Sequence, residues 1–269
     1  MQKFIVFGRG RSGTTVIADE ISRHPEVALP VERIELEGQL WERIEPFARG
    51  EAPAFADARE IVAGWEEPLP YELWLWQRGA TDNLQARIAY LEDFEACGAA
   101  AGAKAVGFKI IDNQLGERVG LPELLAQRGY SVVNIHRRNV VRHALSGLIA
   151  HRRGVFNARN YRDTGGPYPI DVAEFEAAIA HIRHWVKFWD QGFDQIRIRT
   201  LNVFYEDFLA DRAAFHAPIL EFLGLSARTP DVSDFSKMVP KDLSTVIANY
   251  EEIAASCRKY GLEGMLEQP

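Results

Sequence analysis

Gly8-Arg9-Gly10-Arg11-Ser12-Gly13-Thr14-Thr15 lies directly after the apolar run 4–7 and directly before the helix-like stretch 16–22. The order of strand, glycine-rich turn and helix is typical of a phosphate cradle. Glycines allow successive backbone amides to point at one anion, and the helix that follows adds the partial positive charge of its N-terminus. A turn that only connects a strand to a helix has the same pattern. The motif therefore needs support from elsewhere in the chain.

The nucleotide-binding P-loop has a lysine where this sequence has Thr14, although the spacing from Gly8 to Gly13 agrees with that motif. A kinase or ATPase needs the lysine on the transferring phosphates and a partner for magnesium, and no Asp-rich strand end is evident in the sequence. The substitution disfavours a nucleoside triphosphate as the ligand. Arg11, inside the loop, is instead a candidate cation for an anionic group.

A second basic segment, 136–147, follows a predicted strand and leads into a predicted helix. Cations at such a point lie at the carboxyl edge of a parallel sheet, where α/β folds bind ligands. Arg138 and Ser146 are placed so that they can converge on one anion from the turn and from the helix. As a simple charge cluster, Arg137, Arg138 and Arg142 would instead form a solvated face. Two anion sites on neighbouring strands favour a nucleotide with two phosphate groups.

The rest of the chain predicts one α/β domain, 1–269, with a mostly parallel sheet, helices on both faces and a helical insertion at about 36–104. The clearest helix covers 172–190, where apolar residues recur at helical spacing after Asp171, a candidate N-cap. The tryptophans of the insertion either form its core or line an acceptor groove. The loop 153–170 is either a lid or an exposed connection. The predicted strands are 4–7, 106–111, 131–135 and 196–205.

Composition excludes several classes of protein. The 269 residues carry 31 Lys plus Arg against 38 Asp plus Glu, a net charge of −7, which argues against a general nucleic-acid partner. Cys97 and Cys257 are too few for a disulfide framework or a zinc site, which favours a reducing cytoplasm. The apolar run at the N-terminus is too short for a signal-peptide core or a membrane span. We therefore expect no integral membrane segment and no metal.

Several separated segments resemble the sulfotransferases that use 3′-phosphoadenosine 5′-phosphosulfate (PAPS), especially the bacterial carbohydrate and glycolipid type typified by trehalose sulfotransferases. The resemblance covers most of the chain apart from the helical insertion, and its specificity comes from the order and spacing of the segments. The segments are Arg11-Ser12-Gly13-Thr14-Thr15, His24-Pro25-Glu26-Val27, Gly107-Phe108-Lys109-Ile110-Ile111, Arg138 with Ser146, Tyr205-Glu206-Asp207-Phe208, Phe222-Leu223-Gly224-Leu225 and Asn249-Tyr250-Glu251-Glu252.

The resemblance implies a role for each motif. The segment 11–15 would bind the 5′-phosphosulfate, with Arg11 at the bridging and 5′-phosphate oxygens and Ser12, Gly13, Thr14 and Thr15 sharing the charge. Arg138 and Ser146 would bind the 3′-phosphate, Tyr205 would lie near the adenine, and Lys109 would face the transferring group. Sulfuryl transfer in line requires neutralisation of the departing phosphate and acceptance of a proton, and it requires no metal.

The resemblance also implies which residue is the base. Many relatives that act on phenols and steroids have a histidine two residues after the equivalent of Lys109, but this sequence has Ile111 there. Glycan-sulfating relatives use a glutamate shortly after the His-Pro segment, a position that Glu32 holds. A carboxylate serves as a base when partial burial raises its pKa towards neutrality. Glu35 is the rival, and an acidic pair on the surface is the structural alternative.

The leading hypothesis is therefore a PAPS-dependent sulfotransferase with Glu32, Arg11 and Lys109 as catalytic residues and a small-molecule or glycan acceptor. A small-molecule kinase with an atypical loop and a non-catalytic module that binds adenosine bisphosphate are the alternatives. A glycolipid acceptor would bring a cytoplasmic enzyme to the membrane surface. The sequence leaves the identity of the acceptor and the oligomeric state open.

Overall fold

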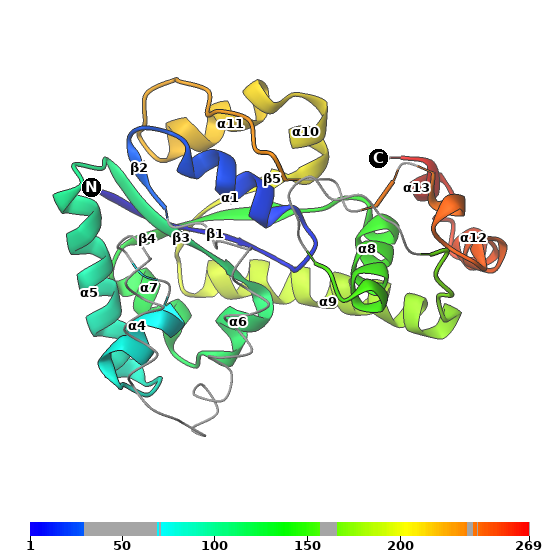
Figure 1. The fold of residues 1–269 in the computed structure, drawn as a ribbon, viewed down its shortest axis with the longest axis horizontal. Helices are drawn as coiled ribbons and strands as arrows, with labels where there is room; N and C mark the ends of the chain where they lie inside the picture. The colour runs from blue at the N-terminus through cyan, green and yellow to red at the C-terminus, as the bar shows by residue number, and fades with distance from the viewer. Residues whose placement is uncertain (30–68, 70, 157–165, 236–238, 241, 269) are drawn as a thin grey trace.

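The computed structural model describes residues 1–29, 69, 71–156, 166–235, 239–240 and 242–268. A five-stranded sheet lies at its centre, and every neighbouring pair of strands is parallel, in the order β2-β3-β1-β4-β5 (Figure 1). The strands are β1 (Gln2–Gly8), β2 (Val27–Ala28), β3 (Ala105–Ile111), β4 (Tyr130–His136) and β5 (Arg199–Phe204). The predicted α/β class and the parallel sheet are confirmed.

Two strand predictions differ from the structure. The two-residue β2 was not predicted, because a strand so short has no alternating pattern to detect. The predicted strand 196–205 begins too early, because the long helix before it ends only at Gln195 and β5 covers Arg199–Phe204. Burial of Phe193 and Ile198 gives the junction an apolar character that helix and strand have in common.

Helices cover both faces of the sheet (Figure 1). On one face, the apolar side chains of β1, β3 and β4 pack against α5, α6, α7 and the end of α9, and those helices share a core with α4. On the other face, the alternate side chains of the same strands pack against α1, α10 and α11. The first group comprises α4 (Tyr71–Arg78), α5 (Leu84–Ala100), α6 (Asp112–Glu117), α7 (Leu121–Gln127) and α9 (Val172–Gln195); the second comprises α1 (Thr14–Ser22), α10 (Tyr205–Ala210) and α11 (Arg212–Phe222).

A third group of helices lies beyond the carboxyl ends of the central strands, on the side where the glycine-rich loop leaves β1 (Figure 1). There, α8 (Val140–Arg153) packs against α9, and both share an apolar core with α12 (Tyr250–Lys259) and α13 (Gly264–Glu267). A 3-10 turn, η2 (Leu243–Thr245), belongs to the same core. The C-terminal segment therefore supports the carboxyl edge of the sheet.

The long helix agrees with its sequence pattern. α9 begins at Val172, and the Asp171 side chain accepts a hydrogen bond from the backbone N–H of Glu174 at 2.8 Å, which confirms the predicted N-cap. Its buried face includes Phe175, Ile179 and Ile182, as the helical spacing predicts.

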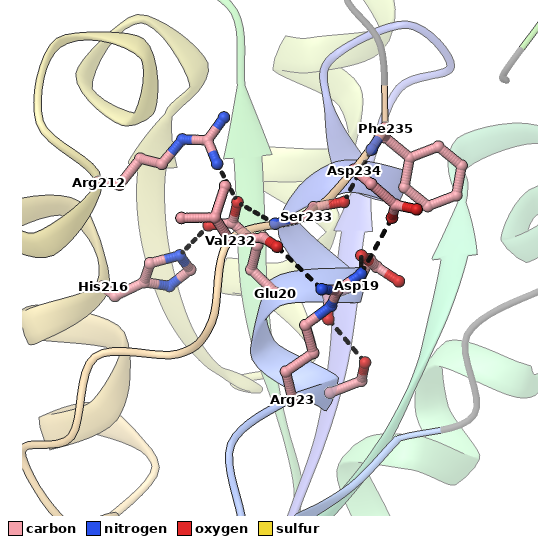
Figure 2. Close-up of polar contacts among 10 residues, drawn as sticks. Asp19, Glu20, Arg23, Arg212, His216, Val232, Ser233, Asp234 and Phe235 are labelled. Atoms are coloured by element: carbon pink, nitrogen blue, oxygen red, sulfur yellow. Dashed lines mark hydrogen bonds and ion pairs between the residues drawn. The ribbon is translucent and has the colours of Figure 1, made fainter. Parts of the chain in front are cut away.

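A buried carboxylate joins α1 to α11 and to the segment 232–235 (Figure 2). Glu20 is 1% exposed, and it accepts hydrogen bonds from Arg212 Nη1 at 2.5 Å, His216 Nε2 at 2.8 Å and the backbone N–H of Ser233 at 3.0 Å. One turn further along α1, Arg23 pairs with Asp19 and Asp234. These contacts hold the helix that follows the glycine-rich loop in place.

Part of the predicted insertion is described, and it contains α4 and α5. Trp74 is buried there and packs against Tyr90, so this tryptophan belongs to the core. Residues 36–68, and residues 157–165 of the predicted lid 153–170, lie outside the described residues, so the extent of the insertion and the lid stay predictions. Among the described residues, no helix combines the length and the apolar sequence that a bilayer crossing requires.

Candidate active site

The glycine-rich loop leads from β1 into α1 as the sequence predicted, and three of its residues have special backbone positions. Gly13 has φ +90°, and a Cβ there would lie 2.3 Å from the Tyr205 ring, so only glycine fits. A Cβ on Gly8 would meet the Ile135 carbonyl oxygen at 2.7 Å. Arg11 has φ +71°, which is strained for a residue with a Cβ. The loop is thus held in one conformation by neighbouring strands.

The loop presents unused hydrogen-bonding capacity at the start of α1. Ser12 is 1% exposed, and its Oγ has no hydrogen-bond partner in the described part of the chain. A buried hydroxyl without a partner is costly. Thr14 and Thr15 are also buried there. This orphaned hydroxyl, together with the glycine cradle, fits an anionic group of a ligand.

Arg11 reaches from the loop to α8. Its Nε donates to Ser146 Oγ at 3.2 Å, and its guanidinium also donates to the Phe156 carbonyl oxygen. Burial, followed by the positive charges of Arg137 and Arg153, lowers the pKa of Arg11 to about 10. Because this pKa remains above neutrality, Arg11 is a cation in a positive environment.

Arg137 is a second cation at the loop, and the sequence analysis gave it no separate role. Its Nη1 donates to the Arg11 carbonyl oxygen at 3.2 Å, its guanidinium lies 5.3 Å from the centre of the Tyr205 ring, and its Nε has no partner among the described residues. Burial lowers the pKa of Arg137. Tyr205 itself covers Gly13, so this aromatic ring lies at the loop, and its place beside an adenine stays a prediction.

The second anion segment is arranged differently from a direct Arg138–Ser146 pair. Arg138 is half-exposed and forms a bidentate ion pair with Asp207, with N–O distances of 2.6 and 2.8 Å. Ser146 lies on α8 and contacts Arg11 instead. The structure therefore joins Ser146 to the glycine-rich loop, through Arg11, and Arg138 to the start of α10, through Asp207.

The motif Tyr205-Glu206-Asp207 contacts both the glycine-rich loop and the basic segment 136–147. Tyr205 packs on Gly13, and Asp207 pairs with Arg138. Glu206 accepts hydrogen bonds from the backbone N–H groups of Arg138 at 3.0 Å and Asn139 at 3.1 Å, just before α8 begins. The sequence resemblance assigned only the tyrosine a role, because the carboxylates act through contacts that no local pattern reveals.

His143 is a further residue for which the sequence suggested no role. It is buried on α8, and burial lowers its pKa to about 3, so the imidazole is neutral at physiological pH. The neutral ring donates from Nε2 to the Gly10 carbonyl oxygen at 2.7 Å. This bond holds one peptide of the loop in a fixed orientation, and it is a positioning contact.

Lys109 lies on β3, the strand next to β1, and its Nζ is 3.4 Å from Thr15 Oγ1. The predicted lysine is thus on the same side of the sheet as the start of α1. At the end of β3, Asp112 binds the loop through Arg9 Nη1 at 2.7 Å and through the backbone N–H of Gly10 at 3.4 Å. The loop is consequently anchored by β3 on one side and by α8 on the other.

The remaining candidates from the sequence are Arg142, the two glutamates proposed as the base, and possible metal ligands. Arg142 does not belong to a solvated face, because it is 1% exposed and donates to the carbonyl oxygens of Pro240 and Leu266. Glu32 and Glu35 lie outside the described residues, so the structure does not place the predicted base. Within the described ranges, no cluster of three or more His, Cys, Asp or Glu side chains is arranged to bind a metal ion.

Among known proteins, the chain is similar to solved structures at low sequence identity. No protein-family model and no curated protein matches the chain. A sulfotransferase from Alicyclobacillus acidocaldarius has a TM-score of 0.47 and 17% identity, over 100% of this chain and 97% of its own. The chain is similar to sulfotransferases. The sulfotransferase domain of the Synechococcus PCC 7002 olefin synthase has a TM-score of 0.44 and 14% identity, over 83% of this chain and 74% of its own.

The sulfotransferase domain from the curacin biosynthetic pathway has a TM-score of 0.43 and 12% identity, over 84% of this chain and 75% of its own. These sulfotransferases are the class of protein that the sequence motifs resemble. Identities this low transfer no residue roles to this chain.

Proposed function

We propose that this chain transfers a sulfuryl group from PAPS to a hydroxyl of a carbohydrate or glycolipid acceptor. The observation that carries the proposal is the loop itself. A buried serine hydroxyl that has no hydrogen-bond partner among the described residues lies in a glycine cradle, and two partly buried arginines, Arg11 and Arg137, adjoin it. Such a site suits a concentrated negative charge, and Thr14 in place of the P-loop lysine disfavours a kinase.

In the proposed reaction, the acceptor oxygen attacks sulfur while the bond from sulfur to the bridging phosphate oxygen breaks. Arg11 and the loop amides, with Ser12, Thr14 and Thr15, stabilise the charge on the departing phosphate. Lys109, beside Thr15, stabilises the transferring group. The products are a sulfate ester and adenosine 3′,5′-bisphosphate.

Arg138 and Ser146 are the proposed partners of the 3′-phosphate, and Tyr205 is the proposed partner of the adenine. The Arg138 guanidinium is paired with the Asp207 carboxylate. Binding of the donor would therefore replace this carboxylate with the 3′-phosphate as the partner of Arg138. The exchange keeps the arginine paired, and it makes the Arg138–Asp207 contact part of the binding equilibrium.

Donor binding is tested by calorimetry with adenosine 3′,5′-bisphosphate beside ATP. We expect tight binding of the bisphosphate only. Arg138→Ala should weaken it by about 10- to 100-fold, because a charge-assisted hydrogen bond contributes about 1.5–3 kcal/mol.

Arg152→Ala is the matched control for this titration. Arg152, on α8, is like Arg138 an exposed arginine that pairs with a carboxylate, here Glu174 at 2.8 Å, and its substitution should leave the affinity unchanged. Equal binding of ATP and bisphosphate would contradict the proposed donor. Tight bisphosphate binding without transfer to any acceptor would indicate a non-catalytic module.

The proposed base is Glu32, which accepts the proton of the acceptor hydroxyl. Glu32→Gln should leave bisphosphate affinity unchanged and lower turnover by about 10²- to 10⁴-fold, the usual contribution of general base catalysis. Turnover is measured with PAPS and a panel of sugar acceptors.

Glu35→Gln is the comparison variant for the base, since it removes the same charge three residues away. We expect its turnover to resemble that of the unsubstituted chain. The opposite ranking of the two variants would assign the base to Glu35, and normal turnover in both would exclude a glutamate base in this segment.

A further inference from the structure

A cavity of about 380 Å³ lies between α9 and the carboxyl ends of β4 and β5. It belongs to the α9 side of the sheet, because the Phe204 ring that lines it packs near His136, whereas the next side chain, Tyr205, packs on Gly13 across the sheet. Its volume is within the range of small-molecule pockets. The lining residues are His136, Arg137, Val140, Ile182, Arg183, Val186, Lys187, Asp190, Gln191, Asp194 and Phe204.

The lining has an apolar part and a charged part. Ile182, Val186 and Phe204 supply apolar surface. Arg183 and Lys187 are exposed, and in the described part of the chain neither side chain makes a hydrogen bond or an ion pair. An apolar surface beside unpaired cations is the chemistry that recognises an amphiphilic anion.

Charged side chains along this face of α9 include two like-charge pairs at four-residue spacing, Arg183 with Lys187 and Asp190 with Asp194, which repel each other. Lys187 and Asp190, three residues apart, attract. The cations therefore lie together towards the middle of α9, and the carboxylates lie towards its end. Asp190 accepts a hydrogen bond from Asn134 at 3.0 Å. Neither Arg183 nor Lys187 makes an ion pair within the described part of the chain.

We propose that this cavity binds a small organic anion whose apolar body lies on Val186 and Phe204 and whose acidic group reaches Arg183 and Lys187. Arg137 adds a third cation at the same cavity. The like-charge pair, which costs helix stability in the free chain, becomes favourable once an acidic group lies between the two side chains. Arg137 is the one residue that this cavity shares with the phosphate loop, and the other lining residues belong to the cavity alone. The proposal does not depend on the proposed transfer reaction.

The probe is anilinonaphthalene sulfonate, an aromatic anion whose fluorescence rises in an apolar environment. It is titrated into the full chain with saturating adenosine 3′,5′-bisphosphate, so that a sulfonate at the phosphate loop would be displaced. We expect saturable fluorescence that the bisphosphate does not remove. Arg183→Glu with Lys187→Glu should weaken binding by about tenfold or more, because like charges then face the sulfonate.

Two further variants make the test specific. Val186→Trp keeps every charge and should abolish the signal by filling the cavity. Arg228→Glu with Lys259→Glu changes the net charge equally at exposed positions elsewhere and should leave the affinity unchanged. Arg137 is left intact in these variants because it also holds the Arg11 carbonyl oxygen.

Three results would overturn the proposal: no saturable signal, equal affinity in the cavity and control variants, or complete loss of the signal with bisphosphate. Thermal unfolding of each variant shows that the probe reports a folded chain. A chain that binds the probe at the cavity but fails to bind bisphosphate would refute the proposed function and leave this site standing.

Discussion

Arg11→Ala is expected to lower sulfuryl transfer by about two to four orders of magnitude, because it removes a fixed cation from the departing phosphate. The guanidinium is held for this role by Ser146 on α8 and by the Phe156 carbonyl oxygen. Its pKa, lowered to about 10 by burial and by neighbouring arginines, still leaves it charged at neutral pH. The measurement is the initial rate with PAPS and a sugar acceptor.

Arg11→Lys separates charge from geometry. A lysine keeps the positive charge but lacks the planar fork that donates to Ser146, so we expect only partial recovery of the rate. Arg228→Ala, at an exposed position outside the loop, should transfer at the normal rate. A normal rate in Arg11→Ala would remove Arg11 from the site and leave the phosphate role of the loop without its cation.

Glu20→Ala is expected to lower the free energy of unfolding by about 2–4 kcal/mol, because it leaves two buried donors, His216 Nε2 and the backbone N–H of Ser233, without their acceptor. Glu20 and His216 are each 1% exposed, so the lost acceptor lies in the interior, whereas the third partner, Arg212, reaches solvent. At this chain length the loss corresponds to a decrease in Tm of about 10 °C, measured by thermal unfolding.

Glu221→Ala is the matched control for stability. Glu221 is an exposed glutamate of α11, the helix that Glu20 binds, and its substitution should change stability by less than about 0.5 kcal/mol. If both variants unfold alike, the Glu20 cluster does not stabilise the fold. Because α1 begins at the phosphate loop, Glu20→Ala should also weaken bisphosphate binding as the temperature approaches its Tm.

Local sequence was sufficient for much of the architecture. Apolar runs of strand length, the helical spacing of α9 and the glycine spacing of the loop are patterns within short windows, and they predicted the parallel sheet and the strand-turn-helix unit. The same windows failed at the junction of α9 and β5, where buried apolar residues are compatible with both element types.

Long-range contacts decided how the site is assembled. Arg142 reads as a surface charge in sequence, yet packing against the C-terminal segment buries it and supplies carbonyl acceptors. His143 reaches the loop because β4, the strand that leads into α8, is the neighbour of β1, and Glu206 reaches the start of α8 because β4 and β5 are neighbours. No periodicity encodes such contacts, since they depend on strand order.

The sequence by itself determined that a glycine-rich turn would join a strand to a helix and that basic side chains would follow a second strand. Only the tertiary structure decided that Ser146 would contact Arg11 and that Arg138 would pair with Asp207. The physical reason is that turn conformation depends on neighbouring residues, whereas the partner of a charged side chain depends on which distant segments the sheet brings to its carboxyl edge.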